Sequence, residues 1–184
     1  MKRRFPLALT AAIAVLAAPA AAQTSTYTSL ALDACTERPV KVTEELPLAL
    51  WDCPGHGDVT VLVSESDARF GIAYGIGAPA QLADSNTLSP FNSLGDTLEW
   101  RLDAEGQPIA TIVRYFTQRA EGGDDNQVLV VSRLGDASCP IAYVNALANE
   151  DANAIAQQAA DLFAATFVCD LHTPMWIGQG APAF

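Results

Sequence analysis

The chain has 184 residues, of which 21 are acidic, 10 are basic and two are histidine, so its formal net charge at pH 7 is −11. A surface this negative repels phosphate backbones and anionic lipid headgroups, and no cluster of basic residues after residue 22 offsets that repulsion. The composition therefore argues against nucleic acid and anionic membranes as partners. A cationic protein, a cation or a neutral glycan stays compatible with it.

The first 22 residues have the organisation of a secretory signal peptide. A positive segment at residues 2–4 precedes an uncharged apolar run at 7–18, and three alanines at 20–22 supply a cleavage site. The apolar run is shorter than the ~20 residues that a membrane-spanning helix requires. The paired arginines leave twin-arginine export open beside general secretion. We expect an exported single domain over residues 23–184, without membrane insertion, in which seven basic and 21 acidic residues give a net charge of −14.

Alternating apolar and polar residues predict an antiparallel sheet of about six or seven strands. The apolar positions are odd-numbered from Val59 to Val63 but even-numbered from Ala68 to Tyr74, and a strand cannot change its buried face without a turn or bulge. We therefore expect a hairpin turn at residues 64–67. The stretch 76–96 predicts a long irregular connection. The candidate strand segments are 27–32, 47–52, 59–63, 68–74, 98–103, 108–118, 127–134 and 140–147.

From Asn149 the apolar spacing becomes helical, with Asn149 as the predicted N-cap and two acidic residues in the first turn. The tail, 170–184, has no regular period. Strands followed by one helix predict an α+β fold in which the C-terminal helix packs on the sheet. A β-sandwich or a partly closed barrel with a terminal helix is the alternative. The predicted apolar stripe of the helix is Ala152, Ile155, Ala159, Leu162, Phe163 and Phe167.

Four cysteines in an exported chain indicate two disulfides, for which three pairings exist. Sequence order favours Cys35–Cys53 and Cys139–Cys169, because each of these pairs brackets a single supersecondary unit.

The segment WDCPGHGDV, residues 51–59, contains a cysteine, a histidine and two aspartates, all of which are residue types that bind metals. A structural zinc site takes four ligands, usually in two spaced pairs, whereas this segment offers one dense cluster. Its thiol is also required for a disulfide, and Pro54, Gly55 and Gly57 favour a chain reversal. We interpret the segment as a turn between two strands rather than as a metal site or a thiol nucleophile.

No other catalytic arrangement is evident. His56 and His172 are the only histidines, and the chain lacks the G-x-S-x-G motif of serine hydrolases. Glu65 and Asp67 resemble the carboxylate pair of a glycosidase, but a predicted turn accounts for both. The acidic turn at 124–126 does not have the spacing of a calcium-binding EF-hand. We therefore assign no catalytic residue, metal or cofactor.

Three arginines interrupt strand segments that are otherwise apolar. If their strands are neighbours, Arg69, Arg101 and Arg114 share one face of the sheet, with Glu99 and Trp100 at its edge. One interpretation is ion pairing between strands on a solvated face. The other is a patch that binds a carboxylate or another small anionic ligand.

Several segments together resemble a group of small exported proteins of Gram-negative bacteria. These segments are CPGHG at 53–57, SESDARF at 64–70, LEWR at 98–101 and the Asn/Ala-rich helix that ends in FVC at 167–169. The resemblance covers most of residues 23–184. It implies a shared fold with two disulfides and location in the periplasm or outside the cell, and it carries no assigned activity.

The sequence as a whole favours a non-catalytic binding or interaction module with an acidic surface. A cationic protein or a small anionic ligand is the expected partner. The alternative is a hydrolase that acts on a cell-envelope substrate through carboxylates and uses the 76–96 connection as a lid.

Overall fold

The computed structural model describes residues 23–40, 48–75, 86–119 and 122–182. The predicted signal peptide, residues 1–22, lies outside the described residues, as do residues 76–85 of the predicted 76–96 connection.

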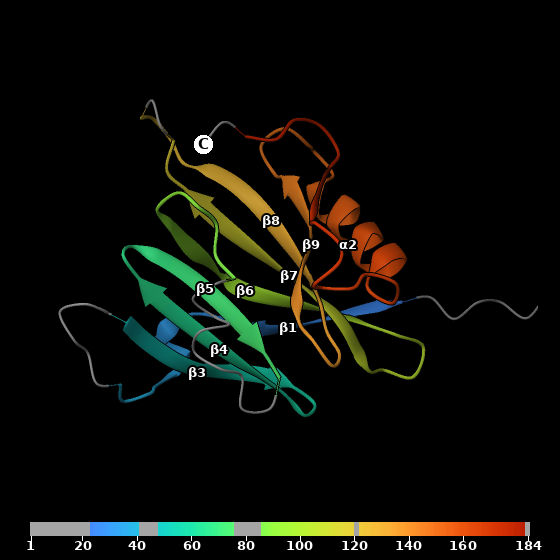
Figure 1. Cartoon of the computed structure of the whole chain (residues 1–184), viewed down its shortest axis with the longest axis horizontal. Coiled ribbons are helices and arrows are strands. Elements are labelled where there is room, and N and C mark those ends of the chain that lie inside the picture. Colours follow the sequence, from blue (N-terminus) through green and yellow to red (C-terminus); the bar gives the residue numbers. More distant parts are fainter. Residues whose placement is uncertain (1–22, 41–47, 76–85, 120–121, 183–184) are drawn as a thin grey trace, which may run out of the picture.

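The described residues form two sheets and one α-helix (Figure 1). The strand order is β1-β6-β7-β8-β9-β10 in the six-stranded sheet and β2-β3-β4-β5 in the four-stranded sheet. Neighbouring strands are antiparallel except for β9 and β10. The elements are β1 (Thr24–Ser29), the 3-10 helix η1 (Leu32–Ala34), β2 (Thr36–Glu37), β3 (Leu48–His56), β4 (Val59–Ser66), β5 (Arg69–Tyr74), β6 (Asn92–Leu102), β7 (Pro108–Thr117), β8 (Asn126–Arg133), β9 (Cys139–Asn145), α2 (Ala152–Phe163) and β10 (Met175–Ile177).

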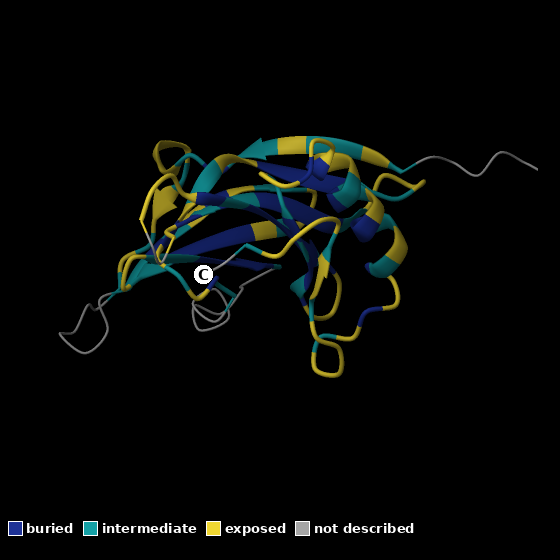
Figure 2. Cartoon of the chain, turned by 90° about the horizontal axis from the view of Figure 1, so that it is seen from above, coloured by how far each residue is buried: buried dark blue, intermediate teal, exposed yellow. Residues whose placement is uncertain are grey.

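The predicted α+β fold, with a C-terminal helix packed on a mostly antiparallel sheet, is confirmed. In the described part of the chain the strands number ten and divide into two sheets, which together with α2 form three layers: the four-stranded sheet, the six-stranded sheet and α2. One apolar core lies between the sheets, where Val63 and Ile72 meet Leu98 and Val113. A second core joins the six-stranded sheet to the helix. Buried residues accordingly lie along the strands between the layers (Figure 2).

The change of parity between residues 63 and 68 reflects a hairpin turn, as predicted, but the turn lies later than residues 64–67, because β4 continues through Ser66. β4 and β5 pair from Ser66 opposite Arg69, which leaves Asp67 and Ala68 as the two loop residues. Both have positive φ, 51° and 56°. Two positive φ angles are the property of the type I′ turn, whose twist matches that of the flanking strands.

The helix differs from the prediction at its start and on its buried face. It begins at Ala152, and Asn149 is not its N-cap: the Asn149 side-chain amide donates to the carbonyl oxygens of Asn145 and Gln179. The predicted stripe is also partly wrong, because Leu162 is 68% exposed. The other five residues of the stripe pack toward the sheet as predicted. The buried positions within the helix are four alanines, two of them outside the predicted stripe, and their small side chains let the helix lie close to the sheet. They are Ala152, Ala156, Ala159 and Ala160.

The helices in the described part of the chain are too short or too polar to cross a membrane.

The tail is not wholly irregular. Residues 175–177 form β10, which pairs in parallel with β9 at the edge of the six-stranded sheet. The ring of Trp176 lies 5.3 Å from that of Tyr143. Asn149 fixes the chain beyond β10, since its Oδ1 accepts a hydrogen bond from the Gln179 amide at 2.8 Å.

Both predicted disulfides are present, Cys35–Cys53 and Cys139–Cys169. The segment 51–59 contains the predicted turn between β3 and β4, but the turn itself is only residues 57–58, with Gly57 at φ 57°. Residues 51–56 belong to β3, whose register shifts between Cys53 and His56. Gly55 is required for close packing, because a Cβ there would lie 1.9 Å from the Val59 carbonyl oxygen. Cys53 is bonded to Cys35 and is therefore neither a metal ligand nor a nucleophile.

Candidate functional site

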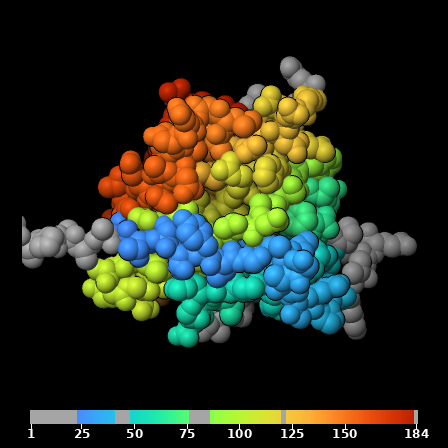
Figure 3. Space-filling view, turned by 180° about the vertical axis from the view of Figure 1, so that it is seen from behind, coloured from blue at the N-terminus to red at the C-terminus, as the bar shows by residue number. Residues whose placement is uncertain are grey.

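The six-stranded sheet has an inner face, toward the other sheet, and an outer face, which carries α2. On β6, Leu98 belongs to the core between the sheets, so the alternation of side chains along a strand places Glu99 and Arg101 on the outer face. On β7, Ile112 packs beneath the helix, which places Arg114 on the same face. Figure 3 shows β1 in blue and α2 in orange, with yellow-green atoms of the sheet between them. Three of the five candidate residues therefore share this face.

Trp100 lies on the inner face, not at the edge of the arginine face. Its side chain is 0% exposed, and its Nε1 donates to Thr28 Oγ1 at 2.9 Å. The rings of His56 and Tyr74 pack against it. Burial in the same core raises the pKa of Tyr74 and the pKa of Tyr115, so neither phenol ionises near neutral pH. Trp100 is a core residue.

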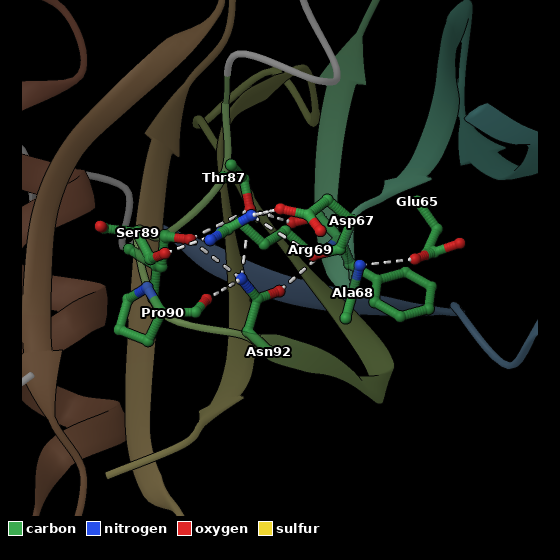
Figure 4. Close-up of polar contacts among 10 residues, drawn as sticks. Glu65, Asp67, Ala68, Arg69, Thr87, Ser89, Pro90 and Asn92 are labelled. Atoms are coloured by element: carbon green, nitrogen blue, oxygen red, sulfur yellow. Dashed lines mark hydrogen bonds and ion pairs between the residues drawn. The ribbon is translucent and has the colours of Figure 1, made fainter. Parts of the chain in front are cut away.

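Arg69 lies on β5 of the four-stranded sheet, whereas the other two arginines lie on β6 and β7 of the six-stranded sheet. Figure 4 shows Arg69 among its polar partners. Its Nε donates to the Ser89 carbonyl oxygen at 2.8 Å, its Nη1 pairs with Asp67, and its guanidinium lies 5.0 Å from the ring centroid of Phe91. Glu65 accepts a hydrogen bond from the Ala68 amide at 3.0 Å. The arginine and both turn carboxylates are therefore occupied in holding the hairpin and the segment beside it.

That segment, residues 86–91, leads into β6 and is held by Asn92. The Asn92 side chain accepts a hydrogen bond from the Phe70 amide at 2.9 Å and donates to the carbonyl oxygens of Leu88 and Pro90 at 3.0 and 2.9 Å (Figure 4). The predicted irregular connection therefore ends earlier than expected, because β6 begins at residue 92.

Arg101 is buried in a bidentate ion pair with the helix. Its Nε and Nη2 donate to the two carboxylate oxygens of Asp161 at 2.9 and 2.6 Å, and its Nη1 donates to Ser25 Oγ at 2.8 Å. The side chain of Arg101 is 7% exposed and that of Asp161 is 25% exposed. This arginine connects β1, β6 and α2, and it is not available to a ligand.

Glu99 is also buried, at 4% exposure, and accepts three hydrogen bonds from neutral donors. Ser25 Oγ and Gln157 Nε2 donate to Oε1 at 2.5 and 2.6 Å, and Asn153 Nδ2 donates to Oε2 at 3.1 Å. The helical partners of Glu99 and Arg101 lie four residues apart, so they form one polar stripe along α2. We call these six residues the interlayer network: Ser25, Glu99, Arg101, Asn153, Gln157 and Asp161.

A groove of about 430 Å³ opens beside the interlayer network, at the N-terminal end of α2. Glu99 and Arg114 both line it, so the structure brings two of the candidate residues to one cavity. The remaining lining residues are Tyr27, Gly95, Asp96, Thr97, Ile112, Phe116, Leu129 and Asn153.

An irregularity in β6 shapes this groove. The register shifts between Leu94 and Leu98, so that extra residues of β6 bulge over β7. Gly95 lies directly over Arg114, since a Cβ at Gly95 would be 3.4 Å from the Arg114 Cβ, an ordinary contact distance. Asp96 and Thr97 are exposed and line the groove together with Arg114.

The groove can hold a small polar ligand with an apolar part, since it combines charged groups with Ile112, Phe116 and Leu129. The described residues contain no group of three or more histidine, cysteine, aspartate or glutamate side chains placed to hold a metal ion. Sequence reasoning missed Tyr27, Asp96 and Asn153. Only the polar spacing of the helix at 153, 157 and 161 could have indicated a contact with charged residues of the sheet.

Comparison of the chain with models of protein families, with curated proteins and with solved structures finds no match.

Proposed function

We propose that the protein is an exported binding module without catalytic activity, and that the groove on the outer face is its ligand site. Arg114 anchors the carboxylate of a small anionic ligand. The observation that carries this proposal is the state of Arg114: over residues 23–40, 48–75, 86–119 and 122–182 it forms one hydrogen bond, from Nη1 to Gln127 Oε1 at 2.7 Å, and no ion pair.

Residues 23–184 contain three acidic residues for each basic residue, and three of the six described arginines, Arg38, Arg69 and Arg101, each pair with an aspartate. The other three form no ion pair within the described residues, but their surroundings differ. Arg133 donates to the carbonyl oxygens of Ala164 and Ala137, and Arg119 is exposed, whereas Arg114 lines a groove. A guanidinium has five N–H donors in a planar array that fits a carboxylate. Arg114 uses one of the five within the described residues and is partly buried in a cavity of ligand size.

Location outside the cytoplasm is part of the proposal. The two disulfides are typical of proteins from oxidising compartments. With the signal sequence and the resemblance to exported Gram-negative proteins, they support a role in the periplasm or in the medium.

The test is calorimetric titration of the oxidised protein, residues 23–184, with carboxylates that bear an apolar group, such as 3-phenylpropionate. We expect binding to the unchanged protein and about tenfold weaker binding, or none, to Arg114→Gln, because the charged anchor is lost. Arg38→Gln is the matched control: it removes the same charge from an exposed pair on the other sheet and leaves the affinity unchanged.

Two results would overturn the proposal. One is equal affinity of the Arg114→Gln and Arg38→Gln variants for every carboxylate, or no binding at all. The other is turnover of a peptidoglycan or ester substrate that disappears in Asp96→Asn. The second result would establish the hydrolase alternative, which the presence of two carboxylates, Asp96 and Glu99, in the same groove favours.

A further inference from the structure

The groove is lined by two carboxylates, Asp96 and Glu99, as well as by Arg114. Glu99 says more about the ligand, because it is the buried one of the two carboxylates. Burial of a charge is costly unless the charge is compensated. Glu99 is 4% exposed, and no lysine, arginine or histidine of the described residues forms an ion pair with it. The nearest guanidinium in its hydrogen-bond network, that of Arg101, is separated from it by the Ser25 hydroxyl and is itself paired with Asp161. A carboxylate has about four acceptor sites, and three neutral donors use three of them at Glu99. Glu99 lines the groove, so it can accept a further hydrogen bond from a ligand there.

Arg114 and Glu99 are close enough to act on one small molecule. Glu99 is opposite Ile112 in the β6–β7 pair, and Arg114 lies two residues further along β7 on the same face. The backbone positions of such diagonal neighbours are about 7–8 Å apart. Both side chains line the same groove, so the two ends of one small molecule can each make a charge-assisted hydrogen bond there.

Asp96 adds a second negative group. It is exposed on the bulge of β6, lines the same groove and has no ion-pair partner in the described part of the chain. A ligand with only negative charge is attracted by Arg114 but repelled by the two carboxylates. A ligand with only positive charge is attracted by the carboxylates but repelled by Arg114. A ligand that carries both charges is attracted at each end.

We propose that the ligand is a zwitterion of the amino-acid type, with its carboxylate on Arg114, its ammonium toward Glu99 and Asp96, and its apolar side chain among Tyr27, Ile112 and Phe116. This inference rests on the proposed function, because it uses the same groove and the same anchor, and it adds the ammonium site.

The test compares three probes that share one ring and differ in charge: phenylalanine as either enantiomer, 3-phenylpropionate, which lacks the amine, and phenethylamine, which lacks the carboxylate. Titration calorimetry with the oxidised protein is expected to show phenylalanine binding about tenfold more tightly than either analogue, since each analogue loses one ionic contact.

Two variants assign the charges. Asp96→Asn is expected to weaken phenylalanine severalfold without weakening 3-phenylpropionate, whereas Arg114→Gln weakens both. Asp52→Asn and Arg38→Gln are the matched controls, because they remove the same charges from an exposed pair on the other sheet. Glu99→Gln is a less direct test, since an amide nitrogen in place of an oxygen would face donors from Ser25, Asn153 or Gln157 and destabilise the fold.

The outcomes separate this inference from the proposed function. If 3-phenylpropionate binds as tightly as phenylalanine and Asp96→Asn changes neither affinity, the ammonium site is disproved and the carboxylate site stands. If only phenethylamine binds, or if no probe binds, both are disproved. A preference for phenylalanine that Asp96→Asn reduces and Asp52→Asn leaves unchanged supports both.

Discussion

Arg101 and Arg114 are the same residue type on the same face of neighbouring strands, yet their surroundings are opposite. Arg101 is buried against Asp161 and Ser25, with all three of its guanidinium nitrogens bonded. Arg114, on the adjacent strand, donates to Gln127 and otherwise lines an open groove. One arginine joins the layers of the fold, and the other is available to a ligand.

The helix explains the difference. Its polar stripe lies over β6, where Asn153 and Gln157 bind Glu99 and Asp161 binds Arg101. The helix begins at Ala152, so it has no turn before Asn153 that could place a polar side chain over Arg114. Arg114 therefore lies beyond the N-terminal end of the polar stripe and lines the groove. The length and rotation of α2 therefore decide whether a charged residue on this face binds the helix or is available to bind a ligand.

The largest expected effect separates the two arginines by stability. Arg101→Met is expected to lower the free energy of unfolding by about 3 kcal/mol, because it leaves the partly buried Asp161 carboxylate without its cationic partner and removes one of the hydrogen bonds of the Ser25 hydroxyl. Arg114→Met is expected to change it by less than about 0.5 kcal/mol. Urea unfolding of the oxidised variants, followed by circular dichroism, measures both values.

Equal losses in the two variants would contradict the comparison. Asp161→Asn gives an independent measurement, since it retains the size of the side chain but removes its charge, and it is expected to destabilise the protein in the same direction as Arg101→Met.

A smaller effect tests the hydrogen bonds to Glu99. Gln157→Ala is expected to cost about 1.5 kcal/mol, because a buried carboxylate loses one of its three donors. Gln158→Ala is the matched control: it makes the same change at the next, exposed position of the helix, where alanine favours the helix slightly. Thermal unfolding of the pair gives the difference directly, and identical midpoints would show that the Glu99 contact contributes no stability.

Much of the fold was predictable because strand patterns repeat every two residues. The parity change is such a signal: it indicated the hairpin turn, although it placed the turn at 64–67 rather than at Asp67 and Ala68. The chain order of the cysteines gave both disulfides. The division into two sheets was not predictable in this way, since it depends on which strands pair at a distance. The short strand β10 carries no period, and its position depends on β9 and on Asn149.

The site was predictable only in part. Alternation along β6 places Glu99 and Arg101 on one face and Trp100 on the opposite face. The prediction that Trp100 lies at the edge of the arginine face was therefore contrary to the period of its own strand. The separation of Arg69 from the other arginines follows from sheet pairing, which the local sequence does not contain. The groove depends on the bulge at Gly95 and on the start of α2, and neither was recognised from the sequence.

The smallest expected effect tests the rotation of the helix, on which the comparison of the two arginines depends. The periodicity of the sequence places Leu162 on the buried stripe, whereas the structure leaves it 68% exposed and buries alanines. Leu162→Gln is therefore expected to change the free energy of unfolding by less than about 0.5 kcal/mol. Ala156→Gln brings the same side chain to a position that is 0% exposed and is expected to cost about 2 kcal/mol or more, because the interior has no room for it and no partner for its amide. A loss of about 2 kcal/mol or more in Leu162→Gln would mean that this residue is buried. The helix would then be rotated, Asp161 would no longer face Arg101, and the two arginines would not differ as described.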